Sequence, residues 1–139
     1  MKKLRQILLI DDDSTTNFVN ERLLTSLQIA KNVKVLTDGQ QAFNFLSETW
    51  EEDKASPELV VLDHHMPVMN GLELMEELNW SGKLDGVEVV FLLLAIETSK
   101  EDLKVFKELG VQEITDKPLC KETLMDVYNK YWAGSTANT

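Results

Sequence analysis

Short apolar runs alternate along the chain with longer stretches in which apolar residues recur at helical spacing. Most of the runs are continuously apolar rather than alternating with polar residues, as is typical of parallel strands that are covered on both faces. This alternation indicates strands joined by helical crossovers. We expect the strands at residues 6–10, 33–36, 59–62, 87–94 and 111–115.

Capping residues stand before the amphipathic stretches. Side-chain oxygens of Ser, Thr, Asp and Asn can accept hydrogen bonds from the free N–H groups of a first helical turn. We expect such caps at Ser14 or Thr15, at Asp38, at Asn70, and in the capping-box pattern of residues 98–101. Five strand–helix units predict a doubly wound α/β fold, in which ligands bind beyond the carboxyl ends of the strands where the strand order reverses.

Length and composition limit the classes of protein to which the chain can belong. With 139 residues, 43% of them hydrophobic, the chain can bury one core, so we expect one domain over residues 1–132 and a disordered tail over 133–139. Its 24 Asp and Glu against 14 Lys and Arg give a net charge of −10, which disfavours direct binding to nucleic acid or to a membrane surface. No apolar run approaches the roughly 20 residues of a membrane span. We therefore expect a cytoplasmic protein.

Charged residues collect just after three of the expected strands. Asp11 and Asp12 follow the first strand, Asp63 follows the third, and Lys117 follows the fifth. If the first and third strands are neighbours, their carboxylates converge in one crevice, where mutual repulsion requires a cation. A site made only of oxygen ligands suits Mg²⁺. A carboxylate beside such a metal and a lysine is equipped to attack phosphorus, because the two cations neutralise charge on the phosphoryl oxygens.

Three motifs together resemble the receiver domains of bacterial two-component response regulators, over essentially all of residues 6–132. The resemblance implies a flavodoxin-like fold with five parallel strands in the order 2-1-3-4-5 and five helices, as a stand-alone receiver. The motifs are Ile7-Leu8-Leu9-Ile10-Asp11-Asp12-Asp13, Leu62-Asp63-His64-His65-Met66-Pro67-Val68-Met69-Asn70-Gly71 and Asp116-Lys117-Pro118-Leu119.

The resemblance also implies a role for each residue of the site. Asp63 would be the phosphoacceptor, and Lys117 would pair with the phosphoryl oxygens. Asp11 and Asp12, with Asp63 and the backbone carbonyl of His65, would bind Mg²⁺ or Mn²⁺. The peptide bond between Lys117 and the following proline would be cis, as in the family.

The same resemblance implies protein partners rather than a turnover reaction. A sensor histidine kinase or a histidine phosphotransfer protein would donate the phosphoryl group. A downstream protein target would receive the signal, and we expect it to bind at the surface formed by the last two helices. We expect a monomer or a weak homodimer.

The sequence departs from the family at the residues that usually read the phosphoryl group. Receivers place a Thr or Ser at the end of the fourth strand, but residues 87–96 contain no hydroxyl. Counting from the flanking motifs leaves Leu93, Leu94 and Ala95 as candidates for that position. The aromatic residue that often stands in the fifth strand is also missing, and Ile114 takes its place. We therefore expect the usual hydroxyl-and-aromatic relay to be weak or absent.

Other notable side chains have simpler structural explanations. Asp13 favours the positive N-terminal end of the first helix and is not expected to bind metal. His64 and His65 lack further His or Cys partners, so we expect solvated loop side chains rather than ligands of a transition metal. The single cysteine, Cys120, is expected to be a small buried hydrophobe.

Two alternatives to a phosphorylation-controlled switch remain open. The first is a degenerate receiver that acts as a phosphorylation-independent protein-binding module, which the missing hydroxyl favours. The second is a phosphatase of the haloacid dehalogenase type with Asp11 as its nucleophile, since residues 11–15 fit the Asp-x-Asp-x-Thr motif. The Thr or Ser that this family requires after a later strand is not found where the fourth strand ends. A flavin carrier of similar fold is disfavoured because three aspartates would repel the flavin phosphate.

Overall fold

A computed structural model describes residues 3–52 and 56–133 of the protein. Within them, five strands form one parallel sheet in the order β2-β1-β3-β4-β5, which confirms the predicted fold class. The strands are β1 (Ile7–Ile10), β2 (Val33–Leu36), β3 (Leu59–Asp63), β4 (Val90–Ala95) and β5 (Glu113–Asp116). The helices are α1 (Ser14–Leu27), α2 (Gly39–Glu52), α3 (Gly71–Trp80), α4 (Lys100–Glu108) and α5 (Lys121–Tyr128), followed by the π-helical segment η1 (Asn129–Ala133).

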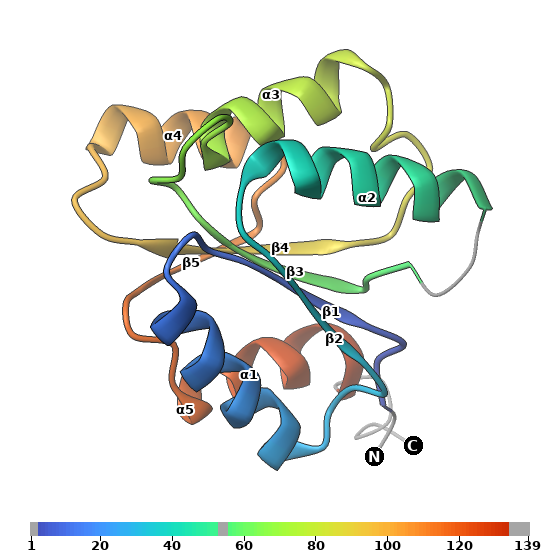
Figure 1. Ribbon diagram of the computed structural model, residues 1–139, viewed down its shortest axis with the longest axis vertical. Coiled ribbons are helices and arrows are strands. Elements are labelled where there is room, and N and C mark those ends of the chain that lie inside the picture. The colour runs from blue at the N-terminus through green and yellow to red at the C-terminus, as the bar shows by residue number, and fades with distance from the viewer. Residues whose placement is uncertain (1–2, 53–55, 134–139) are drawn as a thin grey trace.

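Helices cover both faces of the sheet. Figure 1 shows α1 and α5 below the sheet and α2, α3 and α4 above it. Successive strand residues point to opposite faces, so Leu9 packs in one core with Tyr128 of α5, while Leu8 packs in the other with Phe106 of α4. The continuous apolar runs of the central strands therefore feed two separate cores, one on each side of the sheet.

The last two strands begin later than the sequence predicts. The apolar pattern predicts strands from residues 87 and 111, but β4 starts at Val90 and β5 at Glu113. The side chain of Gln112 explains part of this difference. Its Oε1 accepts from the N–H of Phe91 at 2.7 Å, and its Nε2 donates to the carbonyl of Val89 at 2.9 Å. A side chain thus occupies backbone groups that a longer β4–β5 ladder would pair.

Side-chain caps start four of the helices. Asp38 and Asn70 cap α2 and α3 as predicted, and each accepts a hydrogen bond from the N–H group three residues later. The cap of α4 is Ser99, which accepts from the N–H of Asp102, one residue later than the predicted capping box of residues 98–101 places it. In α1 the cap is Asp13, whose carboxylate accepts from two N–H groups of the first turn, rather than one of the two residues that follow it. The prediction that Asp13 serves the helix end agrees with this geometry.

Cys120 corrects a sequence prediction, because it is exposed at the N-terminus of α5 rather than buried. Its Sγ lies 3.2 Å from Oγ1 of Thr123. The preceding residue, Leu119, takes the buried position instead. Ala133 ends η1, and residues 134–139 of the predicted tail lie outside the described residues. In the described part of the chain, no helix is both long enough and apolar enough to cross a bilayer.

Candidate functional site

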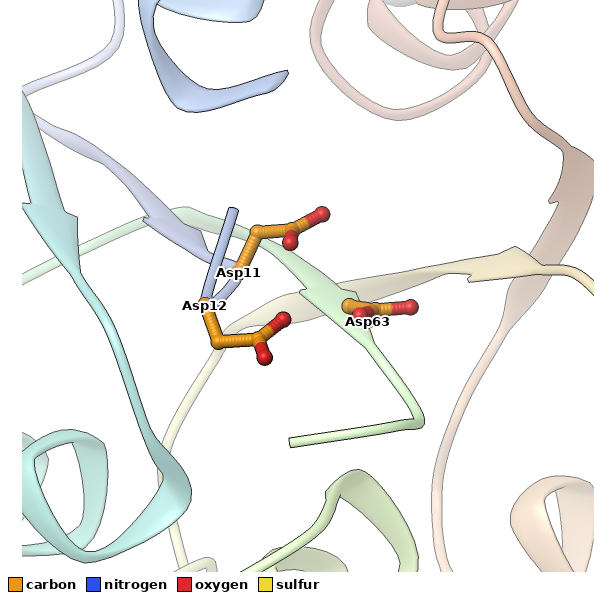
Figure 2. Close-up of side chains that lie close together, drawn as sticks. All are labelled: Asp11, Asp12 and Asp63. Carbon is orange, nitrogen blue, oxygen red and sulfur yellow. The ribbon is translucent and has the colours of Figure 1, made fainter. Parts of the chain in front are cut away.

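Three carboxylates meet beyond the carboxyl ends of β1 and β3. These strands are neighbours, with Ile10 paired to Leu62, and the strand order reverses here because β2 lies on the other side of β1. Oxygen atoms of Asp11, Asp12 and Asp63 all lie within 4.8 Å of one another, as Figure 2 shows. The structure therefore brings together the acidic residues that the sequence predicts to converge.

Asp11 is the most firmly held member of this cluster. Its side chain is buried, and its Oδ1 accepts from the N–H of Asp13 at 2.9 Å. Its Oδ2 accepts from Nζ of Lys117 at 2.8 Å. Its backbone carbonyl accepts from Nδ2 of Asn17 at 2.7 Å. These bonds tie the end of β1 to α1 on one side and to the end of β5 on the other.

Asp63 is equally buried, at 4% exposure, but its negative charge is poorly compensated by hydrogen bonds and positive groups. Its Oδ1 has no hydrogen-bond partner in the described residues and lies 3.5 Å from Nζ of Lys117, which is beyond the usual range of a charged hydrogen bond. Burial and the charge of Asp11 raise the pKa of Asp63, and the attraction of Lys117 only partly opposes them. The cluster is therefore short of positive charge.

Lys117 bridges Asp11 and Asp63 from the end of β5. Burial by itself lowers the pKa of this lysine, but the hydrogen bond to Asp11 and the charge of Asp63 outweigh burial, so the pKa is raised. Lys117 is thus cationic in the site at neutral pH. Its peptide bond to Pro118 is cis, as the resemblance implied.

The residues of this cluster fit a hard divalent cation. Three carboxylates face one lysine, and an oxygen of Asp63 is buried without a hydrogen-bond partner in the part of the chain described. Asp12 is exposed, which leaves the site open to water. Few carboxylates, all-oxygen donors and room for water are what Mg²⁺ requires. The fourth predicted ligand, the backbone carbonyl of His65, lies in the loop two residues after Asp63, and its role stays a prediction.

Two glycines contact the loop between β3 and α3 at positions where a Cβ atom would clash with its backbone. The N–H of Gly71 donates to the carbonyl of His64 at 2.9 Å, and the N–H of Gly39 donates to the carbonyl of Met69 at 2.9 Å. A Cβ atom at Gly71 would lie 2.6 Å from the carbonyl oxygen of Asp63, and one at Gly39 would lie 2.4 Å from that of Met69. The loop after Asp63 is thus held at both ends.

His64 contradicts the expectation of a solvated loop side chain. Its side chain is only 8% exposed, and its ring packs edge-on against Phe106 of α4, with ring centroids 5.0 Å apart. Its Nε2 lies 3.5 Å from Oδ2 of Asp102, also in α4. The expectation failed because α4, which is distant in sequence, covers the end of β3. His65 is exposed as predicted, and its Nε2 lies 3.1 Å from the carbonyl of Ile96.

The end of β4 beside the site is purely hydrocarbon. Leu94 pairs with Asp63 across the sheet, and Ala95 pairs with Asp116, the residue before Lys117. Both side chains are buried. No residue of β4 carries a hydroxyl, so this strand offers no side-chain hydrogen bond to a group on Asp63.

Comparisons with known proteins point to one family. Residues 7–129 match the family described as the response regulator receiver domain. The probable methanogenesis regulatory protein FilR2 of Methanothrix harundinacea is 28% identical over 131 residues, which cover 92% of this chain and 83% of that protein. Two-component response regulator 24 of Arabidopsis thaliana is 25% identical over 123 residues, covering 88% of this chain and 81% of that protein. Since one of these relatives is from a plant, the likeness extends beyond bacteria.

Solved structures agree in fold. A two-component response regulator from Cytophaga hutchinsonii superposes with a TM-score of 0.82 at 27% identity, covering 93% of this chain and 97% of that one. The receiver domain of the histidine kinase CKI1 from Arabidopsis thaliana, complexed with Mg²⁺, gives a TM-score of 0.73 at 20% identity, covering 90% of each chain. At 20% identity, the similarity to the CKI1 receiver domain is one of fold alone.

Proposed function

Because the chain belongs to the response regulator receiver domain family of two-component signalling, we propose that it accepts a phosphoryl group on Asp63 in a reaction that depends on Mg²⁺ or Mn²⁺. The observation that carries this proposal is the convergence of the Asp11, Asp12 and Asp63 carboxylates, with the amine of Lys117 bridging Asp11 and Asp63. Receiver domains are signalling modules rather than turnover enzymes. The product is therefore an aspartyl phosphate on the protein itself.

In the proposed reaction, the carboxylate of Asp63 attacks the phosphorus of a phosphohistidine on the donor protein. The oxygen–phosphorus bond forms while the nitrogen–phosphorus bond breaks, and the imidazole leaves with the electron pair and takes up a proton. Lys117, held by Asp11 at 2.8 Å, pairs with the phosphoryl oxygens. A divalent cation bound by Asp11, Asp12, Asp63 and the carbonyl of His65 would neutralise further charge on those oxygens.

Asp63 must be ionised to act as the nucleophile. Burial and the neighbouring charge of Asp11 raise its pKa and so favour the protonated form. Lys117 opposes both effects, and a divalent cation among the carboxylates would oppose them more strongly. The charge shortage of the site thus supports a role for a metal. The Mg²⁺ complex of the structurally similar CKI1 receiver domain is consistent with this.

The donor is proposed to dock on α1. Phe18 and Val19 are 59% and 55% exposed on this helix, and large exposed apolar side chains often mark interaction sites. Val19 also lines an apolar groove of about 360 Å³ between α1 and the loop after β5, next to Lys117. A sensor histidine kinase or a histidine phosphotransfer protein seated there would bring its phosphohistidine to Asp63. We place this exchange in the cytoplasm, with the protein as a monomer or weak homodimer and a downstream protein as its target.

Intact-protein mass spectrometry tests the proposal. Incubation with acetyl phosphate and Mg²⁺ should add one phosphoryl group, and either EDTA or Asp63→Asn should abolish the addition. The matched control Asp126→Asn removes an exposed carboxylate of α5 and should be phosphorylated like the wild type. The proposal fails if the wild type gains no phosphoryl group from acetyl phosphate or from a phosphorylated phosphotransfer protein.

The phosphatase alternative loses support from the position of Asp13. In the Asp-x-Asp-x-Thr motif the second aspartate works beside the first, but here Asp13 caps α1 through hydrogen bonds to the first turn. Turnover of a phosphomonoester that is lost in Asp11→Asn and kept in Asp63→Asn would restore this alternative.

A phosphorylation-independent binding module keeps one specific observation in its favour, the hydrocarbon end of β4. Such a module would bind its protein target with the same affinity before and after phosphorylation. Titration of an identified target against both forms therefore separates this reading from the proposed switch.

A further inference from the structure

We propose that His64, through its contact with Asp102, carries the phosphorylation state of Asp63 to α4, in place of the hydroxyl that β4 lacks. The inference rests on the proposed function, because it requires a phosphoryl group on Asp63. It adds a pathway that leads from the acceptor to a surface helix.

The position of His64 suits this role. It follows Asp63 directly in the chain, and its carbonyl accepts the N–H of Gly71 at 2.9 Å, so its backbone is anchored to the start of α3. Its buried ring reaches α4 at two places one turn apart. These are the carboxylate of Asp102, 3.5 Å from Nε2, and the ring of Phe106. The residue next to the acceptor in the chain thus contacts two residues on one face of α4.

The ring is held by packing more than by hydrogen bonds. Nδ1 of His64 is buried without a hydrogen-bond partner in the described residues. The distance of 3.5 Å from Nε2 to Asp102 exceeds that of a well-formed hydrogen bond. A buried ring with one long contact and one unpaired nitrogen would lose little hydrogen bonding if it moved to a second arrangement. A small bias between the two arrangements is enough to shift their populations.

Phosphorylation would supply that bias. It places a group with more than one negative charge on the residue that precedes His64. This group competes with Asp102 for the imidazole. Because 41% of the Asp102 side chain is exposed, water can solvate its carboxylate when the contact with the imidazole is lost. The neighbouring ring of His65, 4.6 Å from that of His64, also contacts the carbonyl of Ile96 at 3.1 Å. The two histidines therefore link the loop after β3 to the segment that leads into α4.

The contact acts on the part of α4 that is easiest to open. Asp102 lies in the first turn, where its N–H donates to the cap Ser99 at 3.1 Å. Helix ends fray before helix centres, so a change at this turn alters the local opening of the helix. The end of β4 offers no competing route, since Leu94 and Ala95 have no polar side-chain atom to bond a phosphoryl oxygen.

Hydrogen exchange of the α4 amides, residues 100–108, tests the inference. We expect phosphorylation with acetyl phosphate and Mg²⁺ to change their exchange rates in the wild type by at least about fivefold, the lower end of usual coupling strengths. Asp102→Ala removes the contact from the α4 side. Its matched control is Glu101→Ala, which removes a neighbouring exposed acid from the same helical turn. The exchange response should be lost in Asp102→Ala and kept in Glu101→Ala.

A second variant removes the contact from the other side. His64→Phe keeps an aromatic ring against Phe106 but has no ring nitrogen, so it too should lose the response. Mass spectrometry on the same samples reports phosphorylation separately. If the wild type is not phosphorylated, the proposed function fails and the inference fails with it. If Asp102→Ala and His64→Phe are phosphorylated and the hydrogen exchange of α4 still changes as in the wild type, the inference alone is overturned. This holds even if a variant has a lower melting temperature.

Discussion

The charge balance around Asp63 predicts that Asp63→Asn stabilises the metal-free protein. Asn has nearly the same shape as Asp, so the substitution removes a negative charge and little else. In the wild type this charge is buried beside Asp11, and its raised pKa shows that folding disfavours the ionised form. The substitution should therefore raise the free energy of unfolding, although it removes the proposed acceptor.

The size of the effect follows from the distances in the site. At an effective dielectric constant of about 20, two unit charges 3.5 Å apart interact by about 5 kcal/mol, and two charges 4.8 Å apart by about 3.5 kcal/mol. Asp63 is thus attracted by Lys117 and repelled by Asp11, and it is repelled less strongly by the exposed Asp12. With the penalty of burial added, the net contribution of the ionised Asp63 carboxylate to the stability of the fold is unfavourable. We expect a gain of about 1–2 kcal/mol, or about 3–8 °C in melting temperature.

Thermal denaturation with and without Mg²⁺ measures this effect. Without metal, Asp63→Asn should melt at a higher temperature than the wild type. With Mg²⁺, only the wild type should gain substantially, because a cation that binds the folded state stabilises that state by mass action. The advantage of the variant should be complete above the folded-state pKa of Asp63. It should vanish as the pH falls through that raised pKa towards the ordinary value of 3.8, because the wild-type carboxyl is then neutral too.

The control for this experiment is Asp126→Asn, which removes an exposed charge far from the cluster in sequence and should leave the melting temperature nearly unchanged. The reasoning is refuted if metal-free Asp63→Asn melts below the wild type while the control does not. That result would mean that the attraction of Lys117 exceeds the combined repulsion and burial.

Three further predictions concern other parts of the structure. Gly71→Ala should lower stability by about 2 kcal/mol in urea denaturation, because its Cβ would lie 2.6 Å from the carbonyl oxygen of Asp63; an unchanged midpoint would contradict the described loop. Burial alone would raise the pKa of Glu113, but the hydrogen bond from Lys130 outweighs burial and lowers it, so the ionised form stabilises the fold. Glu113→Gln should therefore lower stability at neutral pH by about 1 kcal/mol. This loss should shrink as the pH falls through the lowered pKa. Ala95→Ser should restore a hydroxyl at the end of β4 and enlarge the exchange response of α4 on phosphorylation, and a response equal to that of the wild type would show that this position does not read the phosphoryl group.

The fold and the acidic site could be predicted because they depend on local patterns. Continuous apolar runs locate the strands, and the strand order that the resemblance implied then brings together the charges that follow β1, β3 and β5. The start of β4 was less predictable, because Gln112 occupies its first backbone groups from a position 21 residues away. Hydrophobicity along the sequence carries no sign of such a contact.

The environment of His64 could not be predicted for a similar reason. A histidine in a loop is usually solvated, and nothing near it in sequence marks it as buried. It is covered by α4, whose Phe106 and Asp102 approach only after the sheet has formed. The prediction for Cys120 was wrong in the opposite direction. Its apolar character suggested burial, but the turn into α5 directs Leu119 inward and leaves the cysteine outside.

The ion pair between Lys117 and Asp11 joins residues 106 positions apart, which has a consequence for a chain that is still being synthesised. A nascent chain that ends after α4 already contains all three carboxylates, but it lacks the lysine that offsets their charge. The amine arrives only when β5 leaves the ribosome and adds to the edge of the sheet. Competence to receive a phosphoryl group would then require that all five strands have been made, so a translation product truncated before Lys117 would lack it.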